Sequence, residues 1–197
     1  MKGALITLTP GTDSTHCAMI SLRPLVLLTF AISFAPLAPA LWAGNPENFT
    51  LKSATSEATF SLSQAKGKYV ALHFLLKTEC PHCLRHTRDY FTKAAGLMNV
   101  VQVFVKPDTE QEIAAWAGKL PPEELSRNPI YRDPGAALAK AFAIPDGYKF
   151  HGQVVHYPAT ILLGPDGKEV FRFVGKNNSD RLSFEKLAAK VAELSAR

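Results

Sequence analysis

The chain has 197 residues, of which 47% are hydrophobic and 20% are charged, with 12 Gly, 14 Pro and 3 Cys. This composition is typical of one globular domain. It excludes a disordered chain, a collagen-like chain and a small scaffold held together by disulfides. The net charge is +5, but the basic residues form no run, so the charge does not predict a nucleic-acid surface.

Residues 1–43 are predicted to be a secretory signal peptide. Leu25–Phe34 is an uncharged apolar run that follows Arg23, and the small residues of Ala38-Pro39-Ala40 come after it. A charged segment, a short apolar segment and a cleavage site of the A-x-A type make up such a signal. Met19 is a more usual start for this leader. If the leader is not cleaved, it would instead tether the protein to a membrane.

The folded domain is therefore expected over residues 44–197, in a periplasmic or other extracytoplasmic compartment. Cys17 would leave with the leader, so the mature chain keeps Cys80 and Cys83 alone. Disulfides persist in such compartments, and two cysteines are enough for one redox pair.

Strands are predicted wherever short apolar or alternating runs are bounded by turn residues. In chain order they cover residues 49–51, 59–62, 69–76, 100–105, 159–163 and 169–174. The first two form a short N-terminal hairpin. The run 69–76 is nearly all apolar, which is typical of a strand buried on both faces. The last two form a second hairpin around a Pro-Asp-Gly turn.

Four helices are predicted between and after these strands. The first starts at Pro81 and ends near Gly96, and the last covers 184–194. A capping box at Thr109 opens the second helix, which the prolines at 121–122 end. The third has Asp133 as its cap, and residues 145–157 are interpreted as a long loop. This order predicts an α/β fold with a central mixed sheet flanked by helices.

The motif Cys80-Pro81-His82-Cys83 lies where a buried strand gives way to a helix. Cysteines three residues apart on the first turn of a helix can form and reopen a disulfide with little backbone movement. Cys80 is placed at the helix N-terminus, where free N–H groups and the helix dipole stabilise a thiolate. Pro81 makes the first turn rigid without losing a needed N–H. A protonated His82 would lower the pKa of Cys80 and make the pair more oxidising.

Other interpretations of the motif and of nearby histidines are possible. Half of a zinc site or an inert disulfide would also use this cysteine spacing, although no second cysteine pair completes a zinc site. His73 is interpreted as a core or edge residue of its strand, and His86 as a solvated residue. His151 and His156 could join the two thiols in binding copper, which makes a metal carrier an alternative function.

From residue 48 to 196 the chain resembles the thioredoxin superfamily. Specifically, it resembles the redoxin branch, which includes peroxiredoxins of the alkyl hydroperoxide reductase type and exported thioredoxin-like proteins. The matching segments are the cysteine motif and residues 60–70, 131–135, 157–160 and 164–168. The resemblance implies a thioredoxin-like fold. It also implies that Pro158 is a cis-proline packed against the cysteines, and that the main chain of Tyr157 offers polar groups to a substrate.

Two departures from the peroxiredoxin pattern bear on the activity. Cys80 stands where peroxiredoxins have a threonine, which leaves Cys83 at the peroxidatic position. Pro158 stands where they have a catalytic arginine, and proline cannot polarise a peroxide or stabilise a thiolate. The sequence therefore favours a thiol–disulfide oxidoreductase, in which Cys80 attacks and Cys83 resolves the mixed disulfide.

The expected partners are protein or small-molecule thiols and disulfides, or a membrane electron donor, and no cofactor or nucleic acid is expected. A peroxiredoxin-like peroxidase that uses Cys83, with Cys80 as its resolving thiol, is the first alternative. The copper or other metal carrier is the second. The direction of electron flow is left open, because reduction and oxidation use the same residues.

Overall fold

A computed structural model describes residues 46, 48–77, 80–150 and 153–196 of the chain. The predicted leader at 1–43, with Cys17, lies outside these residues, and so does His151. Within the described ranges, no helix is both long and apolar enough to cross a membrane.

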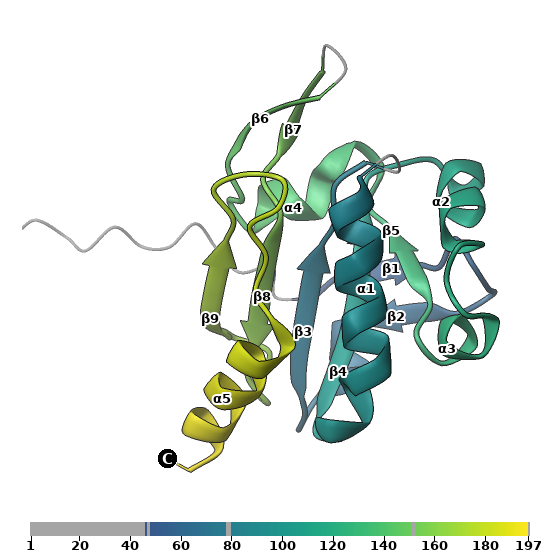
Figure 1. Cartoon of the computed structure of the whole chain (residues 1–197). Coiled ribbons are helices and arrows are strands. Elements are labelled where there is room, and N and C mark those ends of the chain that lie inside the picture. The colour runs from purple at the N-terminus through teal and green to yellow at the C-terminus, as the bar shows by residue number, and fades with distance from the viewer. Residues whose placement is uncertain (1–45, 47, 78–79, 151–152, 197) are drawn as a thin grey trace, which may run out of the picture. The chain divides into compact units, whose positions relative to one another are not determined.

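The centre of the domain is a five-stranded mixed sheet in the order β5-β4-β3-β8-β9 (Figure 1). Its strands are β3 (Tyr69–Phe74), β4 (Val100–Lys106), β5 (Ile130–Arg132), β8 (Ala159–Leu163) and β9 (Glu169–Val174). β3 pairs with β4 in parallel and with β8 in antiparallel fashion. The predicted mixed sheet and its central strand are confirmed. The N-terminal hairpin is also present, as β1 (Thr50–Lys52) paired with β2 (Thr59–Ser61).

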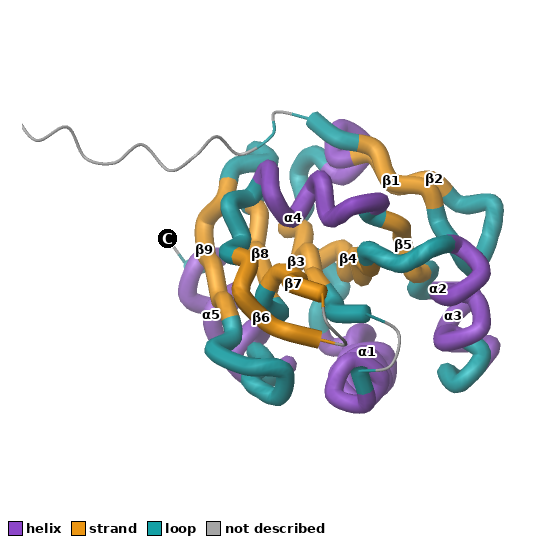
Figure 2. Tube along the Cα trace, turned by 90° about the horizontal axis from the view of Figure 1, so that it is seen from above, coloured by secondary structure: helices purple, strands orange, loops and turns teal. Residues whose placement is uncertain are grey.

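Helices cover both faces of the sheet (Figure 2). On one face lie α1 (Pro81–Lys93) and α5 (Phe184–Ser195), and on the other lies α4 (Ala137–Ala141). Side chains of β3 alternate between the two hydrophobic clusters, with Ala71 in the first and Leu72 in the second. This strand is therefore buried on both faces, as its near-continuous apolar run predicts.

The helix that follows β4 begins as predicted but ends early. In α2 (Glu110–Ala117), Thr109 Oγ1 accepts the N–H of Glu112 at 3.4 Å, and Glu112 Oε2 accepts the N–H of Thr109 at 2.9 Å. The capping box is confirmed. The prolines do not end this helix. Instead Pro122 opens a further short helix, α3 (Pro122–Arg127), because proline is favoured in a helix's first turn.

Asp133 caps its helix from a distance rather than at the predicted position. A 3₁₀ turn, η3 (Pro134–Ala136), comes first, with Gly135 and Ala136 at positive φ. The Asp133 carboxylate reaches past it and accepts the N–H groups of Leu138 and Ala139 at 2.8 and 3.0 Å. The third helix therefore begins at residue 137 and not at 134.

The interpretation of residues 145–157 as a long loop is wrong. This segment forms a hairpin of β6 (Asp146–Phe150) and β7 (Gln153–His156). The pairing shifts register between Asp146 and Tyr148, which breaks the alternation that marks a strand. The hairpin is also separate from the main sheet, so it has no buried apolar run to reveal it.

Candidate active site

The two cysteines lie at the N-terminus of α1, at the end of the sheet where β3 finishes. Cys80 is the N-cap of the helix, and its sulfur accepts the N–H of Cys83 at 3.3 Å. Pro81 occupies the first turn, as predicted. Both cysteines are free thiols, and Cys80 is 3% exposed whereas Cys83 is fully buried. The Cys83 sulfur also accepts the N–H of Leu76 at 3.3 Å.

Arg181 supplies a positive charge to both sulfurs. Its Nη2 donates to Cys83 Sγ at 3.2 Å and to Cys80 Sγ at 3.4 Å. Asn178 Oδ1 accepts from the Cys80 thiol at 3.4 Å. Both residues lie in the segment between β9 and α5, about a hundred positions along the chain from the cysteines. Sequence reasoning missed them, because no local pattern links this segment to the cysteine motif.

The segment that carries Arg181 is held against Pro158. The N–H of Gly175 donates to the Pro158 carbonyl at 2.8 Å, and Lys176 N–H donates to Asp180 Oδ2 at 2.9 Å. A Cβ at Gly175 would lie 2.2 Å from the Asp180 carbonyl oxygen and 3.0 Å from Pro158 Cγ. Only glycine therefore allows this close approach of two backbone segments.

Gly175→Ala should displace the segment and weaken the contact between Arg181 and the sulfurs. We expect the variant to lose about 1–3 kcal/mol of stability, because the backbone must shift to admit a Cβ. We also expect its thiolate to titrate at higher pH. Urea unfolding and thiolate absorbance measure the two effects. Gly118→Ala is the matched control, since a Cβ there meets its nearest atom at 3.5 Å. Equal behaviour of the two variants would contradict the packing described.

The surroundings of the sulfurs separate the two thiol pKa values. Burial raises the pKa of Cys83, but the hydrogen bond from the Cys80 thiol and the charges of Arg181 and Lys106 outweigh it and lower the pKa to about 6. The same hydrogen bond, together with burial, raises the pKa of Cys80 well above its usual value. The pair therefore holds one negative charge at neutral pH, and the second proton stays on Cys80.

A buried lysine lies behind the cysteines. Lys106, the last residue of β4, is fully buried, and its ammonium donates to the Leu76 carbonyl. The same ammonium lies 3.4 Å from Asp108 Oδ2 and 4.6 Å from the centroid of the Trp116 ring. Burial lowers the pKa of Lys106, while the charges of Cys83 and Asp108 act in the opposite direction. The sequence shows this residue only as the end of an apolar strand.

His82 is half-buried on the first turn of α1, where its Nδ1 accepts from Arg85 Nη2 at 2.6 Å. The cations that act on the cysteine pair in this structure are Arg181 and Lys106. The predicted effect of His82 on Cys80 remains a prediction.

The main chain of Tyr157 is already hydrogen-bonded within the chain. Its N–H donates to the Pro145 carbonyl at 3.0 Å, and its carbonyl accepts from His156 Nδ1 at 2.8 Å. A client that used the Tyr157 N–H, as the resemblance implies, would have to displace Pro145. Pro158 itself is buried and contacts the segment that carries Arg181.

His73 and His86 form a buried polar pair in the core. His73 Nε2 donates to Gln102 Oε1 at 2.8 Å, and its Nδ1 lies 3.4 Å from His86 Nε2 and 3.3 Å from Thr160 Oγ1. The interpretation of His73 as a core residue is confirmed. The interpretation of His86 as solvated is wrong, since it is 8% exposed and packs against Tyr90 on the inner face of α1.

Acid should destabilise the protein through His73. Burial lowers the pKa of this histidine to about 4. An unfolded chain binds the proton below about pH 6.5, so stability falls as the pH drops from 6.5 to 4, by about 3 kcal/mol. His73→Gln should flatten this slope in urea unfolding measured across that range. A slope that is the same in His73→Gln and in the unmodified protein would contradict the assignment.

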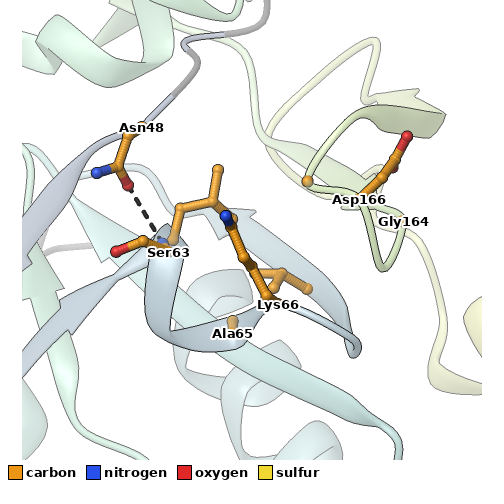
Figure 3. A pocket seen from close by; sticks show the side chains of 9 residues that line it. Asn48, Ser63, Ala65, Lys66, Gly164 and Asp166 are labelled. Atoms are coloured by element: carbon orange, nitrogen blue, oxygen red, sulfur yellow. Dashed lines mark hydrogen bonds between the residues drawn. The ribbon is translucent and has the colours of Figure 1, made fainter.

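A cavity of about 200 Å³ lies near the start of β3, at the opposite end of the sheet from the cysteines. Figure 3 shows the side chains that line it. Asn48, Ser63, Lys66, Gly164 and Asp166 are among its lining residues.

Within the described ranges, no three His, Cys, Asp or Glu side chains are grouped so as to hold a metal ion. The copper-carrier alternative therefore gains no support from these residues.

The Redoxin family profile matches residues 43–190. The chain is a member of the Redoxin family. Membership indicates a thiol-based oxidoreductase, as the resemblance implies, but does not separate disulfide exchange from peroxide reduction. No curated protein matches the chain at a significant level.

Solved structures similar to this Redoxin protein include both thioredoxin-like proteins and peroxiredoxins. The exposed lipoprotein thioredoxin Etrx1 of Streptococcus pneumoniae is 21% identical, with a TM-score of 0.59 over 74% of this chain and 98% of its own. MTB DsbF is 21% identical, with a TM-score of 0.56 over 74% and 94%. Peroxiredoxin Q of Xanthomonas campestris is 19% identical, with a TM-score of 0.57 over 76% and 90%. At these identities the likeness shows the thioredoxin-like fold alone.

Proposed function

We propose that this Redoxin protein is an exported thiol–disulfide oxidoreductase. Its Cys80–Cys83 pair would exchange electrons with the thiols or disulfides of a protein or small-molecule partner. The observation that carries the proposal is the contact of Arg181 with both sulfurs at the N-terminus of α1. This contact stabilises the Cys83 thiolate of the reduced pair, and that thiolate can take up the Cys80 proton when Cys80 attacks a client. Export is proposed from the predicted leader.

The exchange proceeds in two steps that move two electrons from the pair to the client. In the first, the Cys80 proton passes to Cys83 as Cys80 attacks a client disulfide. A Cys80–client disulfide forms, and the other client sulfur leaves as a thiolate that takes up a proton. In the second, Cys83 loses its proton and attacks Cys80 Sγ. The Cys80–Cys83 disulfide forms, and the second client sulfur leaves as a thiolate. Oxidation of a client dithiol is the reverse.

The roles of the two cysteines follow from their burial. Cys83 lies within α1 and is fully buried, and its sulfur accepts the N–H of Leu76, so a client sulfur reaches it less readily. Cys80 is 3% exposed and is the N-cap of the helix, which makes it the cysteine nearer to solvent. The Cys83 N–H donates to Cys80 Sγ at 3.3 Å and the two thiols are hydrogen-bonded, so Cys83 lies close enough to attack Cys80 in the second step.

Peroxide reduction is the second candidate, and Arg181 favours it. Proline at position 158, in place of the peroxiredoxin arginine, argues less strongly against peroxide reduction, because Arg181 donates to Cys83 instead. The pKa of Cys83 is also lowered to about 6. Cys83 would attack one peroxide oxygen, the O–O bond would break with release of water or an alcohol, and a sulfenic acid would form. Condensation with the Cys80 thiol would release water and close the disulfide. Complete burial of Cys83 is the obstacle to this reaction.

One kinetic comparison separates the two candidates. The full chain with Cys17→Ser is reduced and mixed with equimolar hydroxyethyl disulfide or hydrogen peroxide, and thiol loss is followed against glutathione. We expect the reduced protein to react with hydroxyethyl disulfide faster than glutathione does, because Cys83 of the same chain captures the mixed disulfide. We expect peroxide to react no faster than with glutathione. Rapid peroxide loss that survives as a single turnover in Cys80→Ser would make the protein a peroxidase.

A further inference from the structure

The β6–β7 hairpin projects from the end of the sheet at which α1 begins (Figure 1). Its base is fixed by two contacts to Tyr157. The Tyr157 N–H donates to the Pro145 carbonyl at 3.0 Å. Gly147, with a φ of 140°, leaves room for the Tyr157 ring, since a Cβ there would lie 3.2 Å from ring atom Cε2. The hairpin base is therefore anchored beside the residue that precedes Pro158.

A groove of about 240 Å³ lies between this hairpin and the start of α4. One wall is β7, and Figure 2 shows α4 and the hairpin side by side over the sheet. The groove is lined by Lys77, Pro107, Ala136, Lys140, Asp146 and Val154, among others. Lys77 precedes Cys80 by three positions in the chain, so the groove opens close to the cysteine motif.

The lining combines an apolar strip with excess positive charge. Val154 is 61% exposed and lines the groove, so its side chain offers apolar surface there. Lys77 and Lys140 outnumber Asp146, and none of the ion pairs found among the described residues involves either lysine. A binding partner that carries an apolar side chain next to a carboxylate would complement this surface.

We propose that this groove binds an extended, acidic segment of a protein client while the client's sulfur reacts at Cys80. The inference rests on the proposed function. The client segment lies against Val154, and its carboxylates face Lys77 and Lys140. The main-chain groups of Tyr157 are already bonded to Pro145 and His156, whereas the side chains that line the groove remain available to a client.

The test compares three disulfides as substrates of the reduced full chain carrying Cys17→Ser. They are a peptide with one internal disulfide flanked by Glu and Leu, the same peptide with Lys in place of Glu, and hydroxyethyl disulfide. Two groove variants, Val154→Glu and Lys140→Glu, are compared with Val170→Glu and Lys168→Glu. The two control positions are exposed and lie around the β8–β9 turn, at the other end of the sheet.

We expect the acidic peptide to react about tenfold faster than the basic one at low salt, because two lysines face it. Each groove variant should lower the acidic-peptide rate about tenfold relative to its control. The rate with hydroxyethyl disulfide should stay within about twofold, because it needs no groove. Equal peptide rates in groove and control variants would overturn the inference while leaving the exchange activity intact. If the protein with an unmodified groove does not react with hydroxyethyl disulfide, that result would instead overturn the proposed function, and this inference with it.

Discussion

Replacing Arg181 by methionine should raise the pKa of the Cys83 thiol from about 6 toward the ordinary value for a cysteine. Methionine fills much of the same space but donates no hydrogen bond and carries no charge. For a thiol pKa of about 8.5, the thiolate fraction at pH 7 would fall from roughly nine tenths to a few per cent. Titration of thiolate absorbance in the reduced chain with Cys17→Ser measures the shift directly.

The same variant should change the redox equilibrium. Arg181 stabilises the reduced pair, so its loss should move the equilibrium with glutathione toward the Cys80–Cys83 disulfide. Arg85→Met is the matched control, because Arg85 is close to the motif but contacts His82 rather than a sulfur. An unchanged Cys83 pKa in Arg181→Met, or an equal shift in Arg85→Met, would contradict the role assigned to Arg181.

Replacing Lys106 by methionine should cost about 3–5 kcal/mol of stability, because it leaves a buried carboxylate without its cation. Asp108 is 5% exposed, and its Oδ2 has no hydrogen-bond partner among the described residues besides its ion pair with Lys106. The Leu76 carbonyl would lose its donor as well. Urea unfolding of the reduced and oxidised proteins measures the loss.

The double variant Lys106→Met with Asp108→Asn should recover more than half of that loss. The amide carries no charge, so the buried site no longer holds an unpaired ion. Lys93→Met is the control for an exposed lysine with two acidic partners, and its urea midpoint should stay close to that of the unmodified protein. A double variant as unstable as the single one would show that the charge pair is not the cause.

The sequence predicts those parts of the fold that depend on local patterns. The buried run of β3 and the capping box at Thr109 depend on neighbouring residues, and both are present. The motif from Cys80 to Cys83 is also local, so its place at the start of a helix could be predicted. The β6–β7 hairpin could not, because its pairing shifts at Gly147 and it borders no apolar run.

The charged groups of the site depend instead on tertiary contacts. Arg181 reaches the sulfurs from a segment about a hundred positions away, and no spacing rule predicts that approach. Lys106 ends a strand that reads as apolar, and only the fold shows its ammonium buried beside Leu76 and Trp116. The motif therefore locates the cysteines, whereas the charges of Arg181 and Lys106 that lower the Cys83 pKa come from residues outside the motif.

Trapping of the mixed disulfide tests the central claim most directly. The full chain with Cys17→Ser and Cys83→Ser is reduced and mixed with the acidic peptide disulfide, and its mass is followed beside that of the Cys80→Ser counterpart. We expect a peptide adduct on Cys80 in the first protein and little reaction in the second, whose remaining thiol is fully buried. A fast adduct on Cys83 in Cys80→Ser, with none in Cys83→Ser, would show that Cys80 is not the attacking residue.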